Sequence, residues 1–113
     1  MIIESWRDQL TLVLEDKKAI HIQSFKVDSL FADYFIVASA LSSRQLWALC
    51  HAVEKECKSS LIKPIVQGKQ DETRWIVIDA CGVFVHLFLA EGRAYYELEQ
   101  VWQEENLGTR VDI

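Results

Sequence analysis

The hydrophobic residues of this chain recur with two periods, one typical of helices and one typical of strands. Apolar side chains three or four positions apart predict helices over about residues 4–17, 42–61 and 91–105. Alternating or continuous apolar runs predict strands over about residues 19–27, 31–40, 75–80 and 83–89, with a short strand or edge at "PIVQG". This order predicts an α/β (α+β) fold in which helices flank a single mixed β-sheet.

The links between the predicted strands indicate how they pair. "DSLFAD" is short enough to join the first two strands as antiparallel neighbours, and "CG" at residues 81–82 is typical of a tight hairpin turn. The chain has 113 residues, of which 50% are hydrophobic, which suits one domain with a buried core. We therefore expect a single domain over residues 1–113, with a mobile tail from about residue 106.

Charge and composition narrow the classes of partner. A formal net charge of −5 argues against direct, sequence-specific nucleic acid binding, and it would steer the chain towards a basic protein. No apolar run approaches the roughly 20 residues of a membrane span, and the N-terminus lacks a signal-peptide core. Cys50, Cys57 and Cys81 form no CxxC pair. We therefore expect a cytoplasmic protein with reduced thiols and no membrane partner.

The turn "SALSSRQ", from Ser39 to Gln45, stands where many α/β proteins bind phosphate, between a strand and a helix. A phosphate loop needs glycine so that backbone N–H groups can approach the ligand, and residues 32–46 contain none. The turn therefore predicts a helix cap made by Ser42 or Ser43.

Side chains suited to acid–base or metal chemistry are scattered. The chain has no Asp-x-Asp pair of the kind that holds magnesium during nucleotidyl transfer, and no HxxxH pair. His86 lies among valine, leucine and phenylalanine, which predicts a half-buried histidine bonded to a neighbour. We therefore expect no catalytic residue, no metal and no cofactor.

Six segments together resemble the ribosomal silencing factor family, also called the Iojap family. They occur in the family's order between about Leu10 and Trp102, and they read "EDKKA", "ADYFIVAS", "SSRQ", "WIVIDA", "VFVHLF" and "EGRAYYELEQVW". The resemblance implies a nucleotidyltransferase-like fold without catalytic residues. It also implies a translational repressor, not an enzyme, that binds protein fourteen of the large ribosomal subunit and sterically blocks joining of the subunits.

The resemblance also implies partner-binding positions, on two strands and at the start of the last helix. These positions are Trp75, Asp79, Val85, His86, Phe88, Arg93, Tyr95, Tyr96 and Glu99. Packing in the core explains Val85 and Phe88 equally well. The chain departs from the family pattern at Ala40–Leu41, which argues further against phosphate binding, and at Cys81–Gly82, which leaves the hairpin geometry open.

Two other functions stay open at this point. One is a diverged nucleotidyltransferase-like enzyme, against which the missing glycine and the missing paired aspartates count. The other is a homodimeric scaffold, because four tryptophans and the adjacent Tyr95 and Tyr96 are a large aromatic load for this length. Nucleotide binding with magnesium would favour the enzyme, and sedimentation of the pure chain would reveal the dimer.

Overall fold

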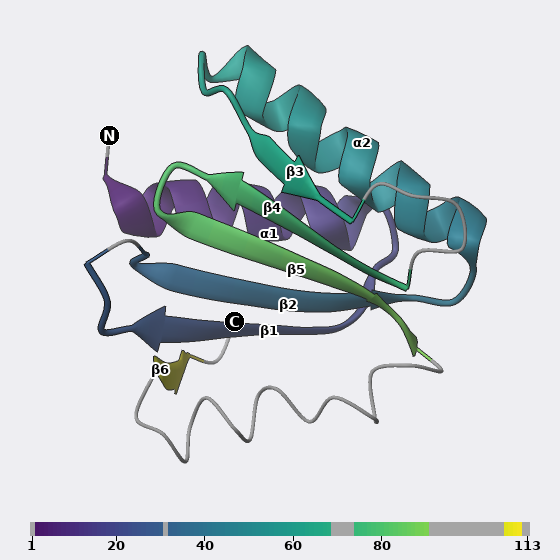
Figure 1. The fold of residues 1–113 in the computed structure, drawn as a ribbon, viewed down its shortest axis with the longest axis horizontal. Helices are drawn as coiled ribbons and strands as arrows, with labels where there is room; N and C mark the ends of the chain where they lie inside the picture. Colours follow the sequence, from purple (N-terminus) through teal and green to yellow (C-terminus); the bar gives the residue numbers. More distant parts are fainter. Residues whose placement is uncertain (1, 31, 69–73, 91–107, 112–113) are drawn as a thin grey trace.

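The computed structural model describes residues 2–30, 32–68, 74–90 and 108–111, which form two helices and one mixed sheet (Figure 1). The helices are α1 (Ile3–Asp16) and α2 (Ser43–Ser59). The strands are β1 (Ile20–Val27), β2 (Tyr34–Ala40), β3 (Ile65–Gln67), β4 (Trp75–Ala80), β5 (Val83–Leu89) and β6 (Gly108–Val111). These bounds confirm the predicted elements up to residue 90, whereas the predicted helix over 91–105 lies outside the described residues.

The six strands form one sheet in the order β3-β4-β5-β2-β1-β6. The pair β2–β5 is parallel, and the other four pairs are antiparallel. The predicted antiparallel pairing of β1 with β2 and the predicted β4–β5 hairpin are therefore confirmed. Cys81 and Gly82 both have positive φ, of 55° and 91°, as a type I′ hairpin turn requires.

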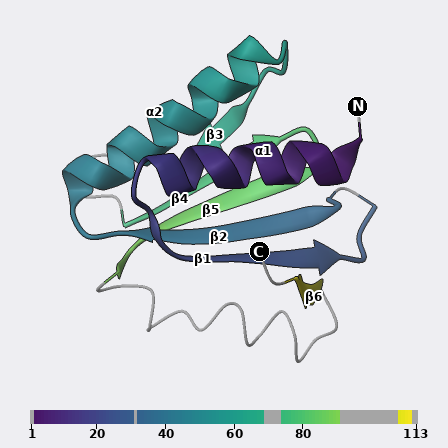
Figure 2. The ribbon, with the colours of Figure 1, turned by 180° about the vertical axis from the view of Figure 1, so that it is seen from behind.

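Both helices pack on the same face of the sheet, as the view from behind shows (Figure 2). In α1 the helical spacing of Trp6, Leu10 and Leu14 places all three side chains against the sheet. The Trp6 indole N–H donates a hydrogen bond of 2.7 Å to the carbonyl oxygen of Ala80, so the polar atom of this buried ring has a hydrogen-bond partner. A second, smaller cluster on the other face of the sheet contains the buried residues Phe25, Val37 and Phe88.

The C-terminal strand is a difference from the sequence prediction. Gly108–Val111 forms β6 and pairs antiparallel with β1, whereas no strand was predicted there. The mobility expected of the tail from about residue 106 stays a prediction. The segment "GTRV" lacks the alternation of apolar and polar residues that predicts a strand. β6 pairs with backbone groups at the edge of β1. Such hydrogen bonds are nearly independent of residue type, so the local sequence does not predict them.

The serine turn forms the predicted cap, and Ser42 is the capping residue. Its Oγ accepts a hydrogen bond of 3.1 Å from the backbone N–H of Gln45. The Gln45 side chain completes the junction, because its Oε1 accepts from the N–H of Leu41 and its Nε2 donates to the carbonyl oxygen of Lys18. The turn therefore joins the start of α2 to the end of α1 with its own side chains.

Replacing Ser42 with alanine should lower the free energy of unfolding by about 1 kcal/mol, because one N–H of the first helical turn loses its acceptor. Ser43→Ala is the matched control: Ser43 lies one position further on, and its change should stay within about 0.5 kcal/mol. Urea unfolding followed by circular dichroism measures both. Equal losses in the two variants would contradict the assignment of the cap to Ser42.

Candidate partner-binding surface

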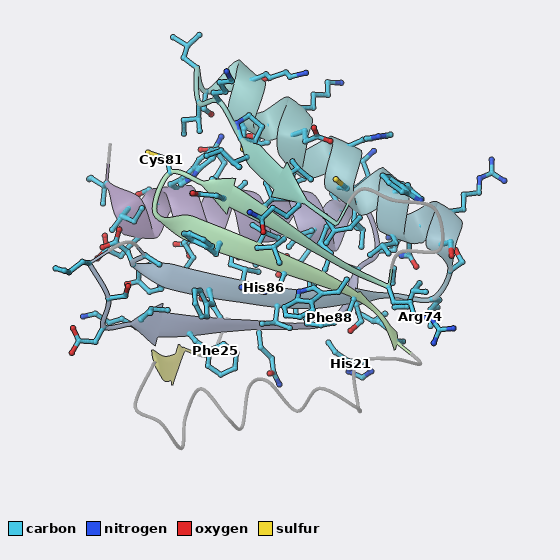
Figure 3. The ribbon with its side chains drawn as sticks, viewed as in Figure 1. His21, Phe25, Arg74, Cys81, His86 and Phe88 are labelled. Atoms are coloured by element: carbon cyan, nitrogen blue, oxygen red, sulfur yellow. The ribbon has the colours of Figure 1, made fainter. Side chains whose placement is uncertain are left out.

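Five rings lie together on the sheet face that points away from the two helices, and we call this group the aromatic face. Alternation along β4 and β5 and the pairing of β2 with β5 bring them there, because residues two apart in a strand share one face. Trp75 is paired with Phe88 across β4 and β5, and Phe35 is paired with Phe84 across β2 and β5. Figure 3 labels two members, His86 and Phe88, on β5. The aromatic face consists of Phe35, Trp75, Phe84, His86 and Phe88.

The rings of the aromatic face are in contact in series. The Trp75 ring stacks on Phe88 with centroids 5.2 Å apart, and its centroid lies 6.0 Å from that of His86. His86 in turn meets the edge of Phe35 at 5.0 Å, and Phe35 lies 6.0 Å from Phe84. Aromatic pairs at these separations each add about 0.5–1.5 kcal/mol beyond their buried area. The series therefore holds each ring in a defined place.

His86 is the polar member of the aromatic face, and it is bonded to a neighbour as predicted. Its Nδ1 accepts a hydrogen bond of 3.3 Å from the indole N–H of Trp75. The side chain is only 6% exposed, so it is buried rather than half-buried. Burial lowers the pKa of His86 to about 4, because the charged imidazolium would lose its hydration. The ring is therefore neutral at pH 7.

The structure brings four of the predicted partner-binding residues to one face. Trp75 and Asp79 on β4 point the same way as His86 and Phe88 on β5. Trp75 and Asp79 are only partly buried, whereas Phe88 is 1% exposed and packs in the smaller core cluster beneath Trp75, as core packing also predicted. Val85 points to the opposite face, where it is fully buried between the sheet and the helices. A direct contact through Val85 is thus blocked by the core, and we leave this residue out of the surface.

The remaining predicted positions lie outside the described residues. They are Arg93, Tyr95, Tyr96 and Glu99.

Two members of the aromatic face were not selected from the sequence. Phe35 and Phe84 are partly buried, and they extend the surface from β4 across β5 to β2. The alternation within "YFIVASA" and "VFVHLFL" does separate both residues from the helix-facing set. What the sequence lacked was the parallel pairing of β2 with β5, which places the two rings next to each other.

A cavity of about 230 Å³ adjoins the start of α2, where Ser42 and Gln45 already occupy backbone N–H groups. Within residues 2–30, 32–68, 74–90 and 108–111, no three histidine, cysteine or acidic residues are grouped to hold a metal ion. Over the same ranges, no helix combines the length and the apolar character needed to cross a membrane.

The three cysteines are free thiols. Cys50 and Cys57 are buried in the core, whereas Cys81 is exposed at the hairpin turn. Burial, reinforced by the nearby Glu56 and Glu54 carboxylates, raises the pKa of Cys57 to about 11. This thiol therefore stays protonated and unreactive at pH 7.

Comparison with known proteins identifies relatives of this chain. The family model described as "Ribosomal silencing factor during starvation" matches residues 3–113. The ribosomal silencing factor of Halalkalibacterium halodurans is 33% identical over 91 residues, covering 79% of this chain and 78% of that protein. The ribosomal silencing factor of Bacillus subtilis is 32% identical over 95 residues, covering 82% and 80%.

A mouse protein and two solved structures are also similar to this chain. A mouse protein named mitochondrial assembly of ribosomal large subunit protein 1 is 33% identical over 102 residues, covering 84% of this chain and 44% of that protein. A crystal structure from Bacillus halodurans matches 97% of this chain and 99% of its own with a TM-score of 0.82 at 26% identity. One from Chromobacterium violaceum matches 91% and 88% with a TM-score of 0.84 at 28% identity. Family model, relatives and fold agree, and the chain belongs to the ribosomal silencing factor family.

Proposed function

We propose that this protein represses translation by binding protein fourteen of the large ribosomal subunit and so blocking the joining of the two subunits. The proposal rests on membership of the ribosomal silencing factor family, whose name describes a role at the ribosome. The mouse relative is named for assembly of the ribosomal large subunit, which supports the large subunit as the place of action. The ribosomal partner itself comes from the family resemblance.

The observation that carries the proposal is the aromatic face. Trp75 and Phe88 stack on each other at a strand pair, and the tryptophan ring is only partly buried. Tryptophan anchors are enriched at the centre of protein interfaces, because a large rigid ring buries much apolar area at little entropic cost. The face thus offers an anchor that is already in place before a partner arrives.

Charge supports a basic partner. Asp79 shares the strand and the face of Trp75, and the chain as a whole carries a formal net charge of −5. An acidic protein is attracted to a basic one over a distance of about 10 Å at 0.1 M salt. We therefore expect Asp79 to lie at the rim of the interface, where it speeds association more than it tightens the complex.

A protein that acts by occupying a surface inhibits in proportion to its amount. Titrating it against purified large subunits, with subunit joining followed by light scattering, should show inhibition that saturates near one copy per large subunit. Free ribosomal protein fourteen in excess should reverse the inhibition, and higher salt should weaken it. Inhibition by far fewer copies than subunits, growing with time and requiring a nucleotide, would instead indicate turnover by an enzyme.

A separate experiment distinguishes a homodimeric scaffold. Sedimentation of the pure protein, alone and with ribosomal protein fourteen, gives the mass of each species. A dimer that persists unchanged when the ribosomal protein is added would contradict the proposed complex.

A further inference from the structure

His86 lies in the middle of the aromatic face but is itself too buried to make an extensive contact with a partner. It is 6% exposed, whereas the neighbouring Trp75 ring is only partly buried. We infer that His86 is a positioning residue. It accepts a hydrogen bond from the indole N–H of Trp75 and so fixes this ring in the orientation that the ribosomal partner binds. The inference rests on the proposed function of the aromatic face.

The backbone at Trp75 is fixed by a separate hydrogen bond. The carbonyl oxygen of the preceding residue, Arg74, accepts a bond of 3.0 Å from the N–H of Leu89. Register then pairs Trp75 with Phe88, and His86, two residues before Phe88 on β5, is the diagonal neighbour of Trp75. With the strand anchored in this way, the orientation of the Trp75 side chain depends on what holds its ring.

Two contacts from β5 act differently on that ring. Phe88 lies flat against it, with an interplanar angle of 19° and a centroid distance of 5.2 Å. Stacking of this kind fixes the plane of the ring but permits it to slide or turn within that plane. The hydrogen bond from Trp75 Nε1 to His86 Nδ1, at 3.3 Å, has a direction and removes this freedom.

The imidazole is itself held so that it can serve as the acceptor. Phe35 meets the His86 ring edge-on at 5.0 Å with an interplanar angle of 63°, which restricts rotation of the imidazole. Because Nδ1 accepts a hydrogen bond from the indole N–H, the neutral imidazole must carry its own proton on Nε2. The series Phe35, His86, Trp75 and Phe88 therefore sets the tautomer, the acceptor and finally the orientation of Trp75.

A double-mutant cycle on partner affinity tests whether His86 acts through Trp75. His86→Phe keeps a ring of similar size but removes the acceptor, and it should weaken binding to ribosomal protein fourteen about 5- to 10-fold. In the Trp75→Phe background, which lacks the indole N–H, the same change should weaken binding by less than about 2-fold. Equal losses in both backgrounds would overturn the inference.

The free protein provides a second measurement that does not require a partner. The indole N–H resonance of Trp75 is assigned by its absence in Trp75→Phe. In His86→Phe its chemical shift should change, and its relaxation should report a more mobile ring. His86→Asn retains an acceptor oxygen near the position of Nδ1, and it should restore part of the wild-type signal. An indole resonance with unchanged shift and unchanged relaxation in His86→Phe would overturn the inference even if affinity falls.

These measurements separate failure of the inference from failure of the proposed function. If the wild-type protein does not bind ribosomal protein fourteen, the proposed function is wrong, and the indole resonance still decides whether His86 orients Trp75. If wild-type binding is intact and the cycle shows no coupling, the proposed function stands and the positioning role is rejected. Circular dichroism and thermal melting of each variant confirm that the comparison is made between folded proteins.

Discussion

Trp75→Ala is expected to weaken binding to ribosomal protein fourteen by about 2–4 kcal/mol, which is a 30- to 1,000-fold increase in Kd. The physical reason is that the ring is partly buried in the free protein and already stacked on Phe88. Little side-chain conformational entropy is therefore lost when the partner binds. Truncation removes the anchor and also exposes Phe88. Calorimetric titration with the purified ribosomal protein measures the change.

The chain offers a matched control for this variant. Trp47 on α2 is also partly buried, but it packs on the helix side of the sheet and lies 6.3 Å from the ring of His51. Trp47→Ala also removes an indole ring, but from the helix-covered side of the sheet. Its effect on Kd should therefore stay below about 2-fold under conditions where the variant is folded. Similar losses of affinity in both variants would mean that stability, and not the aromatic face, limits binding.

The second large effect is a loss of stability in acid that is specific to His86. The pKa of this side chain is about 4 in the folded protein and 6.5 in the unfolded chain. Between these two values the unfolded chain binds more protons, so the contribution of His86 is complete above pH 6.5 and is lost as the pH falls towards 4. From the difference in pKa, this contribution is about 3 kcal/mol.

Urea unfolding of the wild-type protein and of His86→Phe at several pH values between 4 and 7 measures this contribution. Carboxylates protonate in both proteins, and subtraction of the two curves removes their effect. The stability of the wild type relative to the variant should fall by about 3 kcal/mol across this range. Two parallel curves would show that His86 titrates alike in the folded and unfolded states, and hence that it is not desolvated.

The local elements of this protein follow from its sequence, because they depend on near neighbours. Helical spacing in "SWRDQLTLVLED" and the Ser42 cap place α1 and α2 to within a residue or two of the structure. Continuous apolar runs locate β2 and β5, and the "CG" turn locates the hairpin. The missing glycine in the serine turn likewise corresponds to a cap built from side chains.

The candidate surface was predicted only in part. Trp75, Asp79, His86 and Phe88 share one face of the sheet, but adjacent residues in a strand point to opposite faces, which separates Val85 from His86. Alternation alone could have divided these residues into two sets. It could not show which set the helices cover, because that depends on how α1 and α2 cross the sheet.

The sequence by itself determined α1 and α2, most strands, the helix cap and the two alternating faces of each strand. The tertiary structure alone decided that β2 pairs with β5 in parallel, that Gly108–Val111 adds a strand beside β1, and that Phe35 reaches His86. The physical reason is the range of the interactions. Period and capping act within one or two turns of chain, whereas strand pairing joins backbone groups far apart in sequence, whose hydrogen bonds are nearly independent of residue type.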